Sequence, residues 1–116
     1  MLQHVGVEVA PGEIERSVEL WRLLGFERVE PPPTLREYVW LEHDGTQVHL
    51  MPIDSPTVPP RGHTAVVVAD FDGVFAALRE ADFEVERRRE HWGALRAVVI
   101  APGGHRVELM ARPPKR

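Results

Sequence analysis

Four side chains have the types and the spacing to bind a divalent metal ion. His4 and His63 are 59 positions apart, and so are His49 and Glu108 (63 minus 4 and 108 minus 49). Imidazole nitrogens and a carboxylate oxygen are suitable ligands for divalent Zn, Ni, Co, Mn or Fe. The sequence therefore predicts a metal site made of these four residues. The alternative is a site that has kept the four side chains but binds its ligand without metal.

The common spacing comes from an internal repeat. The segment His4–Ala10 resembles His63–Ala69, and Trp40–Pro52 resembles Val99–Ala111, with an offset of 59 in both cases. Two pairs of similar segments at one offset are hard to assign to chance, and a repeat of this length changes how the whole chain is interpreted. The chain is therefore predicted to contain two tandem modules within a single domain of 116 residues.

The modules are expected at residues 1–53 and 63–116, with residues 54–62 as a stiff linker that carries three prolines. In the first module, alternating valines over His4–Val9 predict a strand, and apolar spacing over Glu13–Leu24 predicts a helix. Three further strands follow, and the second module repeats the order, which gives an α+β fold of two tandem βαβββ modules. The other expected elements are strands at 26–30, 37–42 and 46–53, then a strand at 63–69, a helix at 72–81 capped by Asp70, and strands at 83–89, 94–101 and 105–111.

Strand parity places the four candidate ligands on equivalent faces. In His4–Val9 the valines at alternate positions are expected to face the helix, so His4 faces away from it. The same alternation in the later strands puts His49, His63 and Glu108 on the face opposite the helix. The ligands are therefore expected at matching places in the two modules.

Four segments resemble the vicinal oxygen chelate superfamily, which contains glyoxalase I, bleomycin-binding proteins, fosfomycin resistance enzymes and extradiol dioxygenases. They are His4-Val-Gly-Val-Glu-Val, Glu15-Arg-Ser-Val-Glu-Leu-Trp-Arg-Leu-Leu-Gly-Phe26, Gly62-His-Thr-Ala-Val-Val-Val and Ala101-Pro-Gly-Gly-His-Arg-Val-Glu-Leu109. The last departs from the family's common Asp-Pro-Asp-Gly ending at Ala101 and Gly103, where aspartates are usual. The resemblance implies a glyoxalase-like fold, in which the two modules form a cupped mixed β-sheet around the metal. It also implies ligands from the first and last strands of each module.

The ligand sets of this superfamily leave the subfamily open. Glyoxalase I usually has a carboxylate at the position of His49. Extradiol dioxygenases and fosfomycin thiol transferases use two histidines and one glutamate, which correspond to His4, His63 and Glu108. In that arrangement His49 is a fourth ligand or a substrate contact, and no subfamily matches cleanly.

Other side chains on the expected cup face are candidates for catalysis and substrate binding. A carboxylate displaced from a metal can move a proton next to a carbonyl, and we predict this role for Glu108. Glu8 is a second candidate base or, alternatively, a solvated or paired strand carboxylate. Arg106 has the parity to pair with a substrate carboxylate or phosphonate, unless it belongs to a solvated strand edge. The expected lining of the cup, or alternatively the packing between modules, consists of Tyr38, Trp40, Met51 and Met110.

Composition excludes several classes of protein. The 116 residues include no cysteine, which rules out a disulfide scaffold, a thiolate zinc finger and a cysteine nucleophile. A net charge of −4 argues against nucleic acid as a partner. No apolar run approaches the ~20 residues of a membrane span, and no signal peptide is expected before the first strand. The sequence thus predicts a cytoplasmic protein without membrane or nucleic-acid partners.

Two functions of different classes follow from the pattern and the resemblance. The first is a divalent-metal-dependent lyase, isomerase or transferase that acts on a small oxygen-bearing substrate. The alternative is a non-catalytic protein that binds an antibiotic or metabolite in the same cup. A third hypothesis is an oxygen-activating dioxygenase, but the chain is half the usual length of those enzymes. Small members of the family commonly pair or swap modules, so a homodimer is also expected.

Overall fold

The chain forms two compact units in a computed structural model that describes residues 1–115. The first unit is Met1–Val58 and the second is Pro59–Arg116; they are called the N-terminal half and the C-terminal half below. Each half contains one four-stranded mixed sheet and one long helix. The predicted fold class, α+β with two tandem βαβββ modules, is therefore confirmed.

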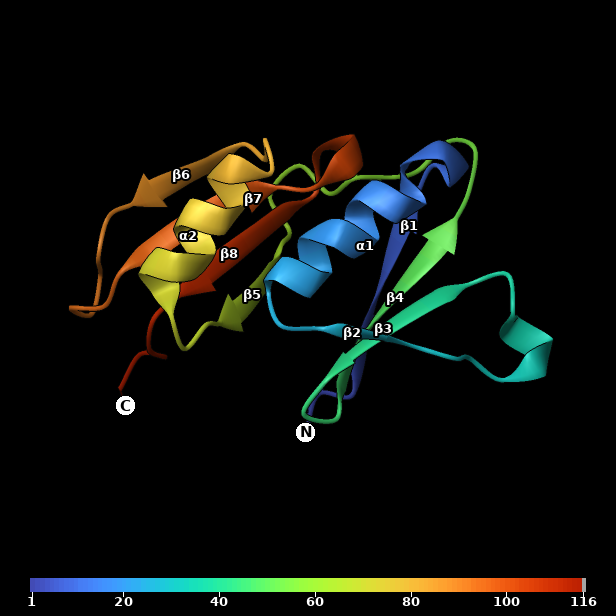
Figure 1. Ribbon diagram of the computed structural model, residues 1–116, viewed down its shortest axis with the longest axis horizontal. Helices are drawn as coiled ribbons and strands as arrows, with labels where there is room; N and C mark the ends of the chain where they lie inside the picture. Colours follow the sequence, from blue (N-terminus) through green and yellow to red (C-terminus); the bar gives the residue numbers. More distant parts are fainter. Residues whose placement is uncertain (116) are drawn as a thin grey trace. The chain divides into compact units, whose positions relative to one another are not determined.

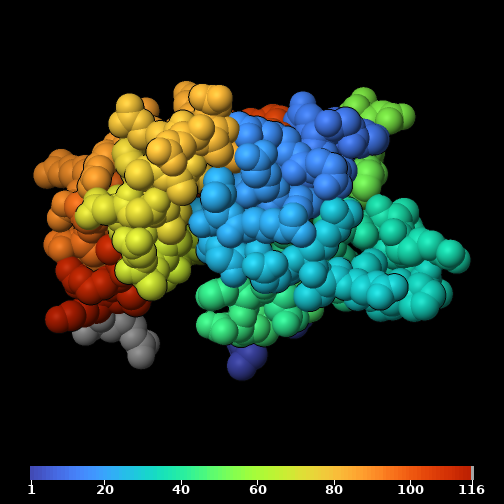
Figure 2. Space-filling model, in the orientation of Figure 1, coloured from blue at the N-terminus to red at the C-terminus, as the bar shows by residue number. Residues whose placement is uncertain are grey.

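The N-terminal half is built on a sheet with the strand order β1-β4-β3-β2. β1 pairs with β4 in parallel, and the other two pairs are antiparallel. Helix α1 lies across one face of this sheet (Figure 1), and Figure 2 shows the atoms of α1 on the side of the N-terminal half that faces the viewer. The elements are β1 (His4–Val9), a 3-10 turn at Pro11–Glu13, α1 (Ile14–Leu23), β2 (Glu27–Val29), a 3-10 turn at Pro33–Leu35, β3 (Val39–His43) and β4 (Thr46–Pro52).

The C-terminal half repeats this topology, with the strand order β5-β8-β7-β6. β5 pairs with β8 in parallel, and β6 and β7 extend the sheet in antiparallel fashion. Helix α2 lies across one face of this second sheet (Figure 1). The elements are β5 (Thr64–Val67), α2 (Phe71–Glu80), β6 (Val85–Arg88), β7 (Arg96–Ile100), a 3-10 turn at Pro102–Gly104 and β8 (Arg106–Met110).

Each half has its own apolar core between helix and sheet. The alternation of small aliphatic side chains along the strands buries one face, as the period of two requires. Leu50 and Leu109, which are 59 positions apart, have no exposed surface. Around them lie Val9, Val18, Leu20, Trp21, Leu41 and Val48 in the N-terminal half, and Phe71, Leu78, Ala97, Val99 and Val107 in the C-terminal half. The opposite face of each sheet carries the polar side chains that were predicted to do chemistry.

Local signals in the sequence set several element boundaries. Asp44 and Gly45 both have positive φ, 48° and 83°, which is the type I′ geometry of a two-residue hairpin between β3 and β4. The side chain of Asp70 accepts a hydrogen bond from the backbone N–H of Gly73, so the predicted cap of α2 is confirmed. The first strand of the second module is shorter than expected, because ladder pairing with β8 covers only Thr64–Val67. His63 therefore lies one residue before β5.

Within residues 1–115 no helix has the length and the apolar character that a membrane span needs.

Candidate functional site

Three rings form a stack on the N-terminal half's sheet. His49 on β4 lies opposite Gly6 on β1 and opposite Trp40 on β3 in the register of the sheet. The Trp40 and His49 rings are 4.0 Å apart between centroids and 2° from parallel. The His4 ring covers the other side of His49 at 4.1 Å and 17°. The imidazole of His49 is therefore held between two other rings.

The surroundings of His49 favour its neutral imidazole and orient the ring. The His49 Nε2 lies 2.8 Å from the Gln47 side-chain oxygen, and Gln47 donates through its own Nε2 to Glu42 at 2.8 Å. Because the amide oxygen only accepts, Nε2 of His49 carries a hydrogen, and in the neutral ring Nδ1 then keeps its lone pair. Burial lowers the pKa of His49 below its usual 6.5, and the nearby charge of His4 lowers it further. A neutral imidazole is the form that can ligate a metal.

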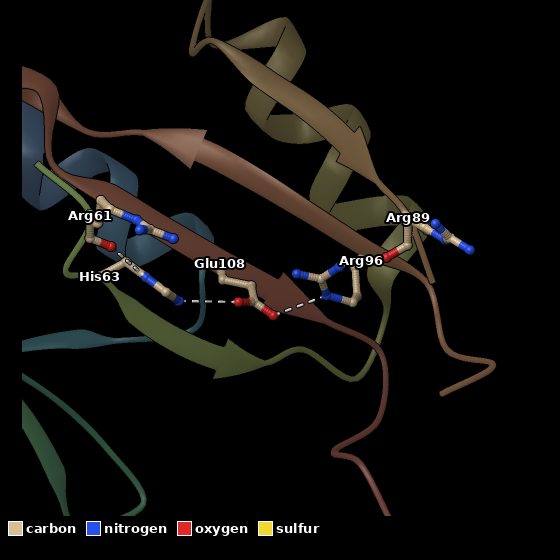
Figure 3. Close-up of polar contacts among 5 residues, drawn as sticks. All are labelled: Arg61, His63, Arg89, Arg96 and Glu108. Carbon is tan, nitrogen blue, oxygen red and sulfur yellow. Dashed lines mark hydrogen bonds and ion pairs between the residues drawn. The ribbon is translucent and has the colours of Figure 1, made fainter. Parts of the chain in front are cut away.

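In the C-terminal half, Glu108 lies between a histidine and an arginine (Figure 3). Its Oε1 is 3.3 Å from Nε2 of His63, and its Oε2 is 3.1 Å from Nε of Arg96. The side chains of Glu108 and Arg96 are only 12% and 13% exposed, whereas His63 is 46% exposed. The backbone oxygen of Arg61 lies 3.0 Å from Nδ1 of His63 and accepts its hydrogen. Nε2 of His63 is thereby directed toward Glu108.

Arg96 is a site residue that the sequence pattern did not single out. Its Nη1 donates to the backbone oxygen of Arg89, and its guanidinium lies 5.4 Å from the centre of the Trp92 ring. Trp92 is itself anchored, because its Nε1 donates to the backbone oxygen of Arg112 at 2.8 Å. Arg96 pairs with Met110 in the β7–β8 register, one step diagonally from Glu108. That register was not visible in the sequence, so only the parity of β7 could have pointed to this arginine.

The other predicted site residues are distributed over both halves. Glu8 accepts a hydrogen bond from the backbone N–H of Thr57 at 2.7 Å, so its carboxylate contacts the connector. The side chain of Met51 lies over Gly6, close enough that a Cβ there would be 3.0 Å from the Met51 methyl. Met110 is buried and Arg106 is exposed.

Tyr38 does not join the ring stack. It borders a shallow pocket of about 470 Å³ beside β2, and neither Trp40 nor His49 lines this pocket. That Tyr38, Trp40, Met51 and Met110 line one substrate cup stays a prediction. Trp40 contacts one predicted metal ligand, His49.

The predicted ligands are found as two pairs, one in each half. Across residues 1–115 no three His, Asp or Glu side chains lie close enough together to hold a metal ion. The 3.3 Å between His63 Nε2 and Glu108 Oε1 equals the separation, about 3.3 Å, of two ligands at tetrahedral angles with bonds of about 2.0–2.1 Å. The donor chemistry of this pair fits a divalent ion.

The pair in the N-terminal half fits less directly. An imidazole lone pair lies in the plane of its ring, so one ion cannot lie in both of two nearly parallel planes. His4 and His49, stacked at 4.1 Å, can therefore share an ion only after one ring rotates. As the rings stand, this pair offers one ligand at a time.

The chain belongs to the Glyoxalase/Bleomycin resistance protein/Dioxygenase superfamily, whose family model matches residues 2–109. The resemblance to the vicinal oxygen chelate superfamily is thereby confirmed. This superfamily includes both metal-dependent enzymes and resistance proteins.

Solved structures share the fold over nearly the whole chain. A glyoxalase family protein from Bacillus anthracis is 25% identical, with a TM-score of 0.82 and coverage of 95% of this chain and 93% of that one. The oxidase ChaP-H2 is 23% identical, with a TM-score of 0.76 and coverage of 98% and 94%. A glyoxalase family protein from Enterococcus faecalis is 21% identical, with a TM-score of 0.71 and coverage of 95% and 96%. A comparison with curated proteins found no match.

Proposed function

We propose that this protein binds a divalent transition metal and acts on a small oxygen-bearing substrate as a lyase, isomerase or transferase. The observation that carries the proposal is the His63–Glu108 pair. Nδ1 of His63 is held by a backbone oxygen at 3.0 Å, and Nε2 faces Glu108 Oε1 at 3.3 Å. A histidine ligand usually donates its second ring N–H in this way, which fixes its tautomer and its orientation. His4 and His49 are proposed as the remaining ligands, from the same chain or from a second copy.

Glu108, Arg96, Arg106 and Glu8 have different proposed roles in the reaction. A divalent ion held by His4, His49, His63 and Glu108 would supply Lewis-acid stabilisation of negative charge on the substrate oxygens. Glu108 is the proposed base once it is displaced from the metal: its Oε1, which faces His63 while Arg96 holds Oε2, could then accept a proton next to a substrate carbonyl. Arg96 holds Oε2 and so fixes the carboxylate plane. Arg106, exposed on the same strand, is proposed to pair with an anionic group of the substrate, and Glu8 stays a second candidate base.

Metal analysis of protein purified without chelator tests the proposal. We expect close to one divalent ion per site in the wild-type protein and a loss of metal in His63→Ala and Glu108→Ala. His91→Ala is the matched control, because His91 is an exposed histidine of the same half outside the proposed ligand set. If His63→Ala and Glu108→Ala keep the wild-type metal content, the proposed site is wrong.

The ring stack favours a second candidate, a binding protein without chemistry. Trp40, His49 and His4 present flat rings at 4.0 and 4.1 Å spacing, a surface on which a planar ligand can add another layer. Bleomycin is a suitable probe because the family contains resistance proteins against it. A protein that takes up neither Zn²⁺ nor Co²⁺, but whose tryptophan fluorescence bleomycin quenches in the wild type and not in Trp40→Leu, would support this candidate over the enzyme.

Two further properties belong to the proposal. A homodimer is expected, and sedimentation equilibrium would measure it as twice the chain mass. A cytoplasmic location is also expected, and cell fractionation would test it.

A further inference from the structure

Arg96 is a largely buried charged side chain beside the proposed ligand Glu108. It contacts three groups of the C-terminal half: Glu108 at 3.1 Å, the backbone oxygen of Arg89 and the face of Trp92. Only 13% of the side chain is exposed. The side chain is therefore fixed by three contacts of different kinds, and Figure 3 shows it directed along the sheet toward Glu108.

We infer that Arg96 is the counter-cation of Glu108 in the metal-free protein and lowers the affinity of the site for a divalent ion. This inference rests on the proposed function, since it concerns the same carboxylate. Arg96 acts through Glu108 and not on the substrate, so it is a positioning residue.

The geometry separates the two oxygens of the carboxylate. Oε2 accepts from Arg96 Nε, and Oε1 faces His63. Without the arginine, the carboxylate could turn about its last bond and either oxygen could face the histidine. Arg96 thus improves the orientation of the ligand, which by itself favours metal binding.

The charge of Arg96 acts in the opposite direction and is the larger effect. A divalent ion beside Oε1 would share one carboxylate with a guanidinium, and two cations separated by one carboxylate repel strongly in a partly buried site. The guanidinium does not have to leave when an ion binds, because Arg89 and Trp92 hold it independently of Glu108. The Arg96–Glu108 ion pair also stabilises the metal-free protein. Without Arg96, a carboxylate that is only 12% exposed would lack its cationic partner.

Two kinds of substitution separate charge from geometry. Arg96→Met and Arg96→Gln remove the positive charge, whereas Arg96→Lys keeps the charge and loses the planar fork. Co²⁺ is the probe, titrated into chelator-free protein and followed by calorimetry and by its visible absorption band, which reports coordination. Arg88→Met is the matched control, because Arg88 is the register partner of Arg96 on β6 and pairs with Glu86 instead.

We expect Arg96→Met and Arg96→Gln to bind Co²⁺ at least about tenfold more tightly than the wild type, equivalent to ~1.4 kcal/mol. Arg96→Lys and Arg88→Met should stay within about threefold of the wild type, because both leave the charge beside Glu108 in place. Circular dichroism checks that each variant is folded, and the glutamine variant answers the question if the methionine variant does not fold.

The outcomes for Arg96 and for the proposed function can be told apart. If the wild type binds Co²⁺ and neither neutral variant binds it more tightly, the inference is overturned and the metal site stands. If the wild type binds none but a neutral variant does, the inference is supported and the metal-dependent activity of the natural protein is not. If no variant binds Co²⁺, both are overturned.

Discussion

The stack of Trp40 on His49 should contribute a measurable coupling free energy to the stability of the protein. The rings are 4.0 Å apart and 2° from parallel, so their faces overlap closely. Stacked aromatic pairs contribute about 0.5–1.5 kcal/mol beyond the area they bury. We therefore expect a coupling of about 1 kcal/mol in a double-mutant cycle of Trp40→Leu and His49→Leu.

The cycle is needed because Trp40→Leu alone changes several quantities at once. The Nε1 of Trp40 is buried and has no hydrogen-bond partner among residues 1–115. Removing such a group favours folding by about 1–3 kcal/mol, while the lost apolar area opposes folding. These contributions cancel between the two arms of the cycle, which leaves the interaction between the rings.

The assay is urea unfolding of the wild type, the two single variants and the double variant, with EDTA present. At about pH 8, well above the ordinary pKa of imidazole, His49 is neutral in the folded and unfolded states, so protonation does not enter the cycle. The linear extrapolation of each unfolding curve gives the four free energies.

The chain offers a matched control pair. His91 and Trp92 are also a histidine and a tryptophan, but their rings are 6.4 Å apart and tilted by 36°. Because these rings are farther apart and do not overlap face to face, their cycle should give a smaller coupling than that of Trp40 and His49. A Trp40–His49 coupling no larger than that of His91–Trp92 would refute the claim that stacking holds the His49 ring.

Three further predictions concern single positions. Burial and the charge of His4 lower the pKa of His49, so the stability that His49 contributes is complete above pH 6.5 and is lost as pH falls below 6.5 toward the lowered pKa. The melting temperature should therefore fall on acidification over this range, and less steeply in His49→Gln; equal slopes would contradict this. Leu50→Ala, at a position with no exposed surface, should reduce the free energy of unfolding by about 2–5 kcal/mol in urea titrations, and a loss under 1 kcal/mol would show that the core collapses around the cavity. Asp70→Ala removes the cap on the Gly73 N–H and should cost about 1 kcal/mol, whereas Asp70→Asn should cost much less; equal losses would mean that the cap is not the cause.

Much of the fold could be predicted because its signals are local or repeated. The alternation around Val5 and Val7 marks a strand and its buried face within a few residues. Asp44 and Gly45 have the φ values that a tight hairpin requires, and Asp70 caps a helix. Because the two halves repeat at an offset of 59, a prediction made for a segment of one half also applies to the equivalent segment of the other.

The candidate site could be predicted only in part. Parity was sufficient to select His49 and Glu108, because the face of a strand residue follows from its neighbours. It was not sufficient to find Arg96, although Arg106 was chosen by the same criterion. The partner of Glu108 depends on which residue of β7 lies beside it in the sheet. This register between β7 and β8 could not be read from the sequence of either strand.

The sequence by itself thus determined the order of the elements, the buried face of each strand and the residue types available for chemistry, because these follow from short-range periodicity and from the repeat. Only the tertiary structure decided which of those side chains touch. Strand pairing placed Trp40 against His49 and Arg96 against Glu108, since contacts across a sheet depend on the register between segments that are distant in the chain.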